Sequence, residues 1–283
     1  MRYDGRDITV LLPVHNAAGY LAEAIESILG QTADGFRLLI CDDGSTDETP
    51  EIIRAVAMRS RCIDTITQPN RGLVETLNRM IGLTQTPIVA RMDADDVALP
   101  ERFALQLELF NEKPEAVCIG GGIQLIDSEG LTIGTPEPTV DHHALYDAAL
   151  RGRTPLSHPT FMMKTEALRR VGGYDHGAYP AEDLDLLLRL GEIGELGCVE
   201  QTVLRYRVHE ASVSVTRRRQ QIAKMREACR RASSRTGVSR PFWADERGSV
   251  YPVHQGVNDP PIINTNPTAA ALAWTGESQG GRS

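Results

Sequence analysis

The sequence predicts an α/β fold with a parallel sheet in its first half and a ligand site at the carboxyl ends of the strands. Apolar runs typical of strands alternate with helix-spaced apolar residues along residues 8–110. This alternation requires crossover connections, which place neighbouring strands in parallel. A polar cluster follows each of the first four apolar runs. Ligands of parallel sheets bind beyond these strand ends.

The expected elements of residues 1–110 follow one another in regular order. The apolar runs predict strands over residues 8–14, 36–41, 63–66 and 87–92. Apolar residues at helical spacing predict helices that include residues 21–29, 52–57, 73–81 and 103–110. Gly30 is placed to end the first helix, Ser45-Thr46 to cap the second, and Pro100 to begin the fourth.

Residues 111–215 are expected to continue the sheet and to form the second wall of the cleft. Short strands are predicted over residues 117–119, 123–126, 131–133 and 198–208, and helices over residues 140–151 and 181–190. Residues 216–235 predict a helix rich in arginine. Residues 236–283 lack periodicity and are rich in Pro, Gly, Asn and Ser, so we expect a largely disordered tail.

Composition excludes several classes of protein. The 283 residues include 30 basic and 38 acidic side chains, a net charge of -8, which argues against a nucleic-acid partner. The five cysteines form no Cys-x-x-Cys pair, which favours reduced thiols and a cytoplasmic location. The polar N-terminus does not resemble a secretory signal, and no apolar run approaches the ~18 residues of a membrane span.

The polar clusters at the strand ends predict a nucleotide-type site. In chain order they are His15-Asn16, Asp42-Asp43-Gly44-Ser45, Asn70-Arg71-Gly72 and Asp93-Ala94-Asp95-Asp96. Asp93 and Asp95 occupy alternate positions at a strand end and can aim both carboxylates at one cation. Oxygen ligands of this kind suit Mg²⁺ or Mn²⁺, which would bridge the oxygens of a diphosphate.

Each cluster taken alone also has a structural interpretation. The Asp42 to Ser45 stretch is typical of a helix-capping turn, and Arg91 can simply be paired or solvated. Glu182 and Asp183 open an apolar helix, where carboxylates are favoured by the helix dipole; the functional alternative is a base that removes a proton from a hydroxyl. His209 follows a predicted strand and could complete a metal shell or contact phosphate.

Taken together, the motifs resemble inverting nucleotide-sugar glycosyltransferases of glycosyltransferase family two. The resemblance covers residues 8–215. It rests on Leu11-Leu12-Pro13-Val14-His15-Asn16, Asp42-Asp43-Gly44-Ser45-Thr46-Asp47, Asn70-Arg71-Gly72 with Asn78, Asp93-Ala94-Asp95-Asp96, Gly172-Gly173-Tyr174, Glu182-Asp183-Leu184-Asp185 and Tyr206-Arg207-Val208-His209. It implies a GT-A-type, Rossmann-like mixed sheet flanked by helices, with the basic helix as a C-terminal extension.

The resemblance also implies roles for individual residues. Those that would bind the nucleotide are Pro13, His15, Asn16, Asp42, Asp43, Arg71 and Asp93. Asp95 would ligate Mn²⁺ or Mg²⁺, and His209 would assist at the metal or the diphosphate. Asp183 would be the catalytic base and Glu182 would help to place the acceptor. The implied donor is a nucleotide sugar, by default a UDP-sugar, and the implied acceptor is a carbohydrate or a lipid-linked molecule, as in the biosynthesis of polysaccharides, glycolipids or glycoconjugates.

Two departures refine this expectation. The chain has no Gln-x-x-Arg-Trp motif, which marks the family's processive synthases, so transfer of a single sugar is expected. The helix of residues 216–235 carries eight basic residues against one acidic one. A solvated helix packed on the domain is the favoured interpretation. Peripheral contact with anionic lipid at the inner face of the membrane is the alternative.

Three other functions compete with this one. The Asp93-Ala94-Asp95-Asp96-Val97 stretch also fits the nucleophile motif of haloacid-dehalogenase-like phosphatases, but that interpretation leaves the upstream clusters unexplained. A non-catalytic nucleotide-sugar-binding module would keep the same residues. A calcium loop fits poorly because the glycine and distal glutamate of that motif are missing.

Overall fold

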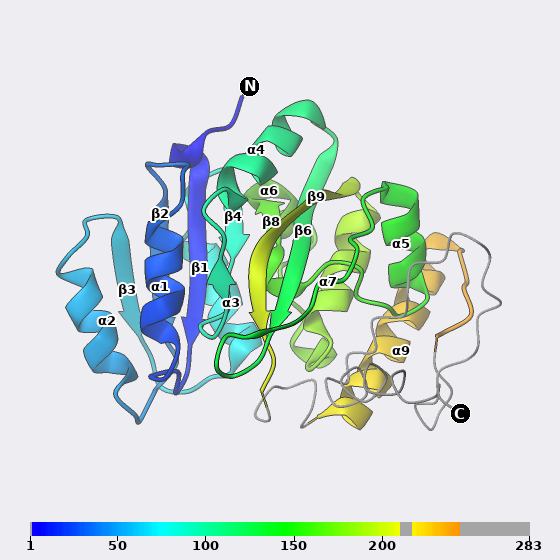
Figure 1. Cartoon of the computed structure of the whole chain (residues 1–283). Helices are drawn as coiled ribbons and strands as arrows, with labels where there is room; N and C mark the ends of the chain where they lie inside the picture. Colours follow the sequence, from blue (N-terminus) through cyan, green and yellow to red (C-terminus); the bar gives the residue numbers. More distant parts are fainter. Residues whose placement is uncertain (1, 210–216, 244–283) are drawn as a thin grey trace, which may run out of the picture.

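A nine-stranded sheet lies between two layers of helices in the computed structural model, which describes residues 2–209 and 217–243 (Figure 1). The strands are β1 (Ile8–Val14), β2 (Arg37–Asp42), β3 (Ile63–Thr67), β4 (Ile88–Arg91), β5 (Val97–Ala98), β6 (Ala116–Ile126), β7 (Thr132–Gly134), β8 (Met162–Lys164) and β9 (Glu195–Arg207). The helices are α1 (Leu21–Leu29), α2 (Thr49–Ala57), α3 (Leu73–Leu83), α4 (Arg102–Glu112), α5 (His142–Leu150), α6 (Thr165–Arg170), α7 (Glu182–Gly191) and α9 (Arg218–Thr236). Short 3₁₀ turns form at η1 (Gly5–Asp7), η2 (His158–Thr160) and η3 (His176–Ala178).

The sheet is mixed, and most of its strands end at one edge. Its order is β3-β2-β1-β4-β8-β6-β9-β5, with β7 paired to β6. Strands β1 to β4 pair in parallel, as predicted for the first half. Strand β8 is antiparallel to both β4 and β6, and β6 and β9 pair in parallel. The carboxyl ends of β1, β2, β3, β4, β6 and β9 therefore share one edge, the lower one in Figure 1.

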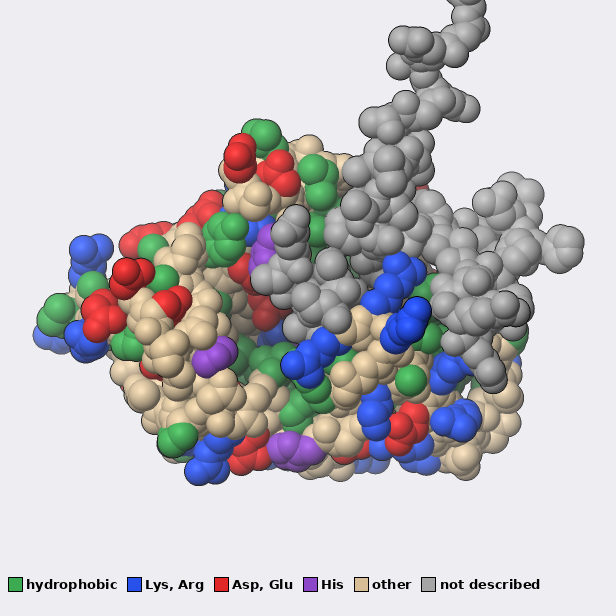
Figure 2. All heavy atoms as spheres, turned by 90° about the horizontal axis from the view of Figure 1, so that it is seen from below, with side chains coloured by type: hydrophobic (Ala, Val, Ile, Leu, Met, Phe, Trp, Pro, Cys, Tyr) green, Lys and Arg blue, Asp and Glu red, His purple; other side chains and the backbone are tan. Residues whose placement is uncertain are grey.

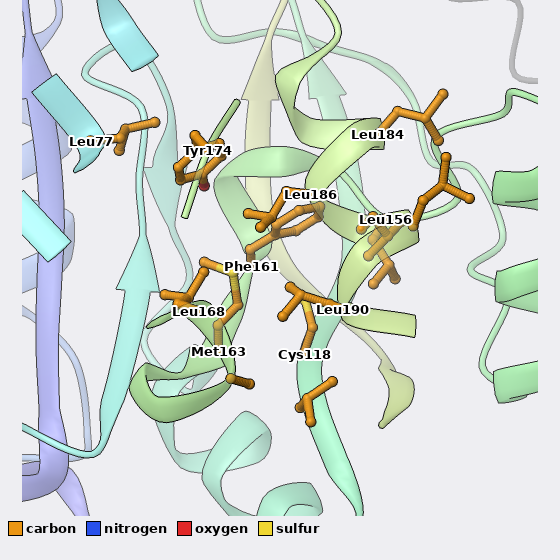
Figure 3. Close-up of a cluster of buried hydrophobic side chains, with 14 of the residues drawn as sticks. Leu77, Cys118, Leu156, Phe161, Met163, Leu168, Tyr174, Leu184, Leu186 and Leu190 are labelled. Carbon is orange, nitrogen blue, oxygen red and sulfur yellow. The ribbon is translucent and has the colours of Figure 1, made fainter. Parts of the chain in front are cut away.

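Alternating side chains bury both faces of the sheet. In β1, Val10 and Leu12 pack with α1, α2 and α4, whereas Leu11 packs with α3 and α7 on the other side. Strands buried on both faces are nearly continuous apolar runs, and residues 8–14 are apolar except for Thr9. Figure 3 shows the second face, where Leu186 and Leu190 of α7 meet Phe161 and Met163.

Two predictions about local structure are wrong. Ser45-Thr46 does not cap α2, which begins at Thr49 after Glu48 and has no side-chain cap. The backbone N–H of Thr46 instead donates to Asn16 Oδ1 at 2.8 Å, so this turn connects two strand ends. The strands predicted over residues 117–119 and 123–126 form the single strand β6.

Strand β6 passes through Gly120-Gly121-Gly122 because a side chain has no room there. A Cβ on Gly121 would lie 2.4 Å from Val203 Cγ2, and one on Gly122 would lie 2.9 Å from the Gln201 carbonyl oxygen. The register between β6 and β9 shifts on both sides of Gly122, as in a β-bulge. The glycines let β9 approach closely and keep pairing until Arg207.

Helix α9 packs on the domain, as favoured from the sequence. Met225, Ala228 and Ala232 are buried in the same core as α7. Arg231 extends from α9 to Asp175 (2.6 Å) and to the buried Asp185 of α7 (3.0 Å). The helix ends at Thr236, and the backbone N–H of Trp243 donates to the Arg151 carbonyl oxygen at 3.0 Å. The described chain is therefore anchored through residue 243, and residues 244–283 of the predicted tail lie outside the described residues.

Within the described ranges, no helix combines the length and the apolar character needed to cross a bilayer.

Candidate functional site

The polar clusters predicted from the sequence meet at the carboxyl edge of the sheet. Figure 2 views this edge directly and shows acidic side chains and a histidine around a hollow in the surface. The edge carries His15 and Asn16 after β1, Asp42 and Asp43 at the end of β2, and Arg71 after β3. Asp93 and Asp95 follow β4, and His209 follows β9.

Three carboxylates after β4 form the acidic cluster, which consists of Asp93, Asp95 and Asp96. One ligand atom from each lies within 4.8 Å of the others. Burial raises the pKa of Asp93, and the negative charge of Asp95 raises it further. Burial and the charges of Asp95 and Asp93 raise the pKa of Asp96 well above its usual range. Negative charge is thus concentrated at one point, where Arg91 pairs with Asp93 and a bound cation would relieve the remaining repulsion.

The last residues of β9 hold the acidic cluster in place. The backbone N–H of Arg207 donates to Asp96 Oδ1 at 2.7 Å, and Arg207 Nε donates to the Asp95 carbonyl oxygen at 2.8 Å. The Arg207 side chain is buried and also forms an ion pair with Glu23 of α1 at 2.7 Å. Its guanidinium stacks over the Tyr20 ring at 4.4 Å. The loop after β4 is therefore held by Arg207 of β9, whose side chain is in turn fixed by Glu23 and Tyr20 at the start of α1.

His209, two residues after the end of β9, contacts the acidic cluster. Its Nε2 lies 2.9 Å from Asp95 Oδ2, although the two residues are 114 positions apart. This hydrogen bond raises the pKa of His209 above its usual value. The two residues that the sequence analysis assigned to metal binding are thus in direct contact.

The donor set of this cluster suits a hard divalent ion. Carboxylate oxygens are the ligands that Mg²⁺ and Mn²⁺ prefer, and imidazole is tolerated by Mn²⁺. Asp96 Oδ2 is buried and has no hydrogen-bond partner among the described residues. Asp96 was not among the predicted metal ligands, yet its oxygens complete the cluster. Its position beside Asp95 in the sequence was the available signal.

The ends of β1 and β2 form a hydrogen-bonded platform for a nucleoside-sized ligand. His15 Nδ1 lies 3.0 Å from the Asp43 carbonyl oxygen. Asn16 has a left-handed backbone (φ 50°), and its N–H donates to Ser45 Oγ at 2.9 Å. Pro13 is buried one residue before the end of β1 and lies beside Cys41 of β2 in the sheet, so it forms part of the floor of the platform.

Asp42 and Asp43 are both buried but are engaged differently. Asp43 Oδ1 accepts from Gln68 Nε2 at 2.7 Å and from the Arg71 N–H at 2.8 Å, and Asp43 Oδ2 accepts from the Gly72 N–H at 2.8 Å. Burial raises the pKa of Asp43, but these hydrogen bonds outweigh it and the net pKa is lowered. Asp42 Oδ1 accepts from the Ser45 N–H at 2.9 Å. Asp43 therefore organises the loop after β3, and Asp42 keeps a carboxylate oxygen without a partner among the described residues.

Arg71 is held in position by its backbone and extends its side chain into solvent. Its guanidinium is exposed and lies 3.8 Å from Glu75, a distance at which the ion pair contributes little. A side chain of this kind can turn toward an anionic ligand at small cost.

The first turn of α7 supplies the second group of carboxylates. Asp183 is half-buried, and Glu182 is buried with its Oε2 lacking any partner among the described residues. Burial raises the pKa of Asp183, and burial together with the charge of Asp183 raises the pKa of Glu182 to about 7. The charge of Arg91 lowers, and that of Asp93 raises, the pKa of both groups. The α7 carboxylates and the acidic cluster thus lie in one electrostatic neighbourhood.

Sequence reasoning did not predict the contacts that hold the chain before this second group. Asn78 of α3 accepts from the Tyr174 N–H and donates to the Tyr174 carbonyl oxygen, both at 2.8 Å. The Tyr174 hydroxyl lies 2.7 Å from His158 Nε2. Burial lowers the pKa of His158 well below its usual value, so its ring is neutral. Asn78 and Gly172-Gly173-Tyr174 contributed to the family resemblance. Their contact could not be predicted from the sequence, because Asn78 and Tyr174 are 96 positions apart.

Comparisons with known proteins agree on one family. Residues 9–172, more than half of the chain, match the family described as Glycosyl transferase family 2. The putative glycosyltransferase EpsE of Bacillus subtilis is 32% identical over 220 residues, which are 76% of this chain and 77% of EpsE. The O-antigen biosynthesis glycosyltransferase WbnJ of Escherichia coli is 30% identical over 209 residues, 72% of this chain and 81% of WbnJ.

Solved structures of lower identity share the fold. TarS 1–349 of S. aureus in complex with UDP-GlcNAc matches with a TM-score of 0.63 at 16% identity, covering 81% of this chain and 65% of that chain. The mannosyltransferase PcManGT of Pyrobaculum calidifontis in complex with GDP-Man and Mn²⁺ matches with a TM-score of 0.59 at 18% identity, covering 84% of this chain and 68% of that chain. The predicted mixed sheet of GT-A type is confirmed.

We expect Asp43→Asn to destabilise the protein by about 1–3 kcal/mol at neutral pH, because an amide NH₂ would face the Gly72 N–H. The lowered pKa of Asp43 stabilises the fold fully above the unfolded value near 3.8, and this contribution is lost as the pH falls through the folded pKa. Urea unfolding should therefore show a difference between wild type and variant that narrows below about pH 4. A difference that stays constant with pH would contradict this role. Asp64→Asn, on the exposed strand β3, is the control and should change stability by less than about 0.5 kcal/mol.

Proposed function

Since this chain belongs to glycosyl transferase family 2, we propose that it transfers a single sugar from a nucleoside-diphosphate sugar to an acceptor hydroxyl with inversion of configuration. The observation that carries the proposal is the shared neighbourhood of the acidic cluster and the α7 carboxylates. Family membership removes the support for the phosphatase alternative, in which Asp93 would be a nucleophile.

The nucleoside of the donor lies on the platform at the ends of β1, β2 and β3. Asp42 accepts the N–H of the base, since Asp43 is occupied by backbone donors. His15 and Asn16 border the nucleoside, and Pro13 supports them from within β1. The exposed Arg71 contributes positive charge toward the diphosphate. Asp93 contacts the ribose or a metal-bound water.

A divalent ion, Mn²⁺ or Mg²⁺, is proposed at the acidic cluster. Asp95 would be its principal ligand, with Asp96 beside it and His209 oriented by Asp95. When bound, the ion would neutralise the charge that develops on the departing diphosphate. The Mn²⁺ complex of PcManGT supports this assignment at the level of the shared fold.

Asp183 is proposed as the base that accepts the proton of the attacking hydroxyl. Its burial raises its pKa, which makes the carboxylate a stronger base than one in water. The hydroxyl attacks the anomeric carbon from the side opposite the diphosphate, and the proton passes to an Asp183 oxygen as the new bond forms. Glu182, with a pKa of about 7 and an oxygen that has no partner in the described ranges, places the acceptor hydroxyl. Orientation and fixed charge supply most of the acceleration.

The relatives support the substrate classes. UDP-sugar donors are supported by the UDP-GlcNAc complex of TarS, although the GDP-Man complex of PcManGT shows that the fold accepts other bases. WbnJ acts in O-antigen biosynthesis, which supports a carbohydrate or lipid-linked acceptor in an envelope polysaccharide. The chain also matches the chondroitin synthase of E. coli but covers only 30% of its length. Single-sugar transfer is therefore proposed for this chain and not for that synthase.

Asp183→Asn should lower the transfer rate by about 100-fold to 10,000-fold, because the amide cannot accept a proton. Donor affinity should change little, because Asp183 lies on the acceptor side. Release of nucleoside diphosphate and titration calorimetry with the donor measure the two quantities. Transfer at the wild-type rate would remove Asp183 from this role. Asp64→Asn is the matched control and should transfer normally.

Chelation of divalent ions should abolish transfer, and added Mn²⁺ or Mg²⁺ should restore it. Asp95→Asn should raise the Mn²⁺ concentration needed for half-maximal rate by about tenfold or more, because a neutral amide is a poorer ligand for a hard cation. The measurement is the initial rate against free Mn²⁺ concentration. Undiminished activity in excess chelator would contradict the proposed metal.

Contact with anionic lipid through residues 216–235 remains a proposal. Lys and Arg side chains gather on the α9 side of the face in Figure 2. Arg218, Arg219 and Arg230 form no ion pair within the described ranges, and Arg219 and Arg230 are exposed. Their eleven-residue spacing places the latter two on one side of the helix.

We expect flotation with vesicles that contain phosphatidylglycerol and no flotation with phosphatidylcholine alone. Changing Arg218, Arg219 and Arg230 to Gln should weaken vesicle binding by about a hundredfold, at about 1 kcal/mol per charge. These substitutions are preferable to deletion of α9, which would uncover the apolar side of α7. Equal flotation of wild type and variant would rule out lipid binding by these arginines and would leave α9 only its role in packing on the domain.

A further inference from the structure

Arg91 is a buried cation at the centre of the site whose hydrogen-bonding capacity is mostly unused. Its side chain is 3% exposed and lies at the end of β4. Nη1 donates to Asp93 Oδ2. Nε is buried and has no acceptor in the described part of the chain. Nη2 also donates to no described residue, but it is not one of the fully buried polar atoms, so a ligand can reach it. An arginine normally uses several of its five N–H groups when it is removed from water, so missing acceptors at this depth are costly.

Arg102 provides an internal comparison. It is also buried, directly beneath the same loop, and each of its three nitrogens has an acceptor inside the protein. Nε donates to Gln106 Oε1 at 3.2 Å, Nη1 to Met92 Sδ at 3.2 Å and Nη2 to the Arg91 carbonyl oxygen at 2.7 Å. The role of Arg102 is complete within the fold. Arg91 differs because the described residues supply an acceptor to only one of its three nitrogens.

The position of Arg91 indicates what could supply the missing acceptors. In the sheet order, β4 lies between the nucleoside platform on β1, β2 and β3 and the strands β8 and β6. Arg91 pairs with Asp93, and its charge also lowers the pKa of Glu182 and Asp183. A donor that begins at the platform and is attacked beside Asp183 must place its sugar between these groups.

We propose that Arg91, paired with Asp93, binds the hydroxyl groups of the transferred sugar and thereby contributes to donor selectivity. This inference rests on the proposed function. The guanidinium donates to hydroxyl oxygens, and the adjacent carboxylate accepts from hydroxyl protons. Together they offer the neighbouring donor and acceptor that a pair of sugar hydroxyls requires. A lysine would keep the charge but lose the fixed planar geometry.

The test compares the affinity for a nucleotide sugar with that for the same nucleoside diphosphate alone, both with Mn²⁺ in calorimetry. The donor is the tightest-binding member of a panel of UDP-GlcNAc, UDP-glucose, UDP-galactose and GDP-mannose. Arg91→Met should weaken the binding of the nucleotide sugar by about tenfold or more and that of the diphosphate by less than about twofold. Arg91→Lys should give an intermediate loss for the sugar nucleotide. If the Arg91→Met variant does not fold, the Arg91→Lys variant provides the comparison of the two affinities.

Arg37→Met is the matched control, because it removes an arginine that is also paired with an aspartate, Asp64, but lies at the amino end of β2, away from the carboxyl edge. It should change neither of the two affinities. An equal loss for nucleotide sugar and diphosphate in the Arg91 variants would assign Arg91 to the phosphates or to packing and would overturn the proposal, as would no loss for either ligand. Wild type that binds no member of the panel would instead contradict the proposed function itself.

Discussion

The carboxyl edge of this sheet depends on two buried arginines that lie beneath a concentration of negative charge. Arg102 supports the backbone at the end of β4 through the Arg91 carbonyl oxygen, and Arg91 forms the ion pair with Asp93. Burial lowers the pKa of Arg102 to about 9, which still leaves it charged at neutral pH. Without these cations, the carboxylates of the acidic cluster would repel one another in a place that water reaches poorly.

The same arrangement connects the two halves of the molecule. The acidic cluster follows β4 in the first half, but its geometry is set by Arg207 and His209 at the end of β9. The loop that precedes α7 is held by Asn78 of α3 and by Arg189, whose Nη1 donates to the carbonyl oxygens of Val171 and Gly173 at 2.7 Å. Donor and acceptor groups are therefore positioned by contacts between residues far apart in the chain.

Much of this could be predicted from residue patterns. Strand β1 was predicted with its observed bounds, since six of its seven residues are apolar and the run is too short for a typical helix. The edge site followed from the rule for parallel strands, and Asp95 and His209 are in contact as their assignment required. Other features could not be predicted. The pairing of Arg91, the engagement of Asp43 by backbone donors and the continuity of β6 through its glycines all depend on neighbours brought close only by the tertiary fold.

The three glycines of β6 have a consequence that reaches beyond their own strand. Because β9 packs against bare backbone there, even a methyl group at Gly121 would have to push Val203 aside. Strand β9 continues from Val203 to Arg207 and leads to His209, so a displacement in the middle of the sheet would move His209 relative to Asp95. Substitution of these glycines would thus disturb the contact between His209 and Asp95 while leaving both side chains chemically intact.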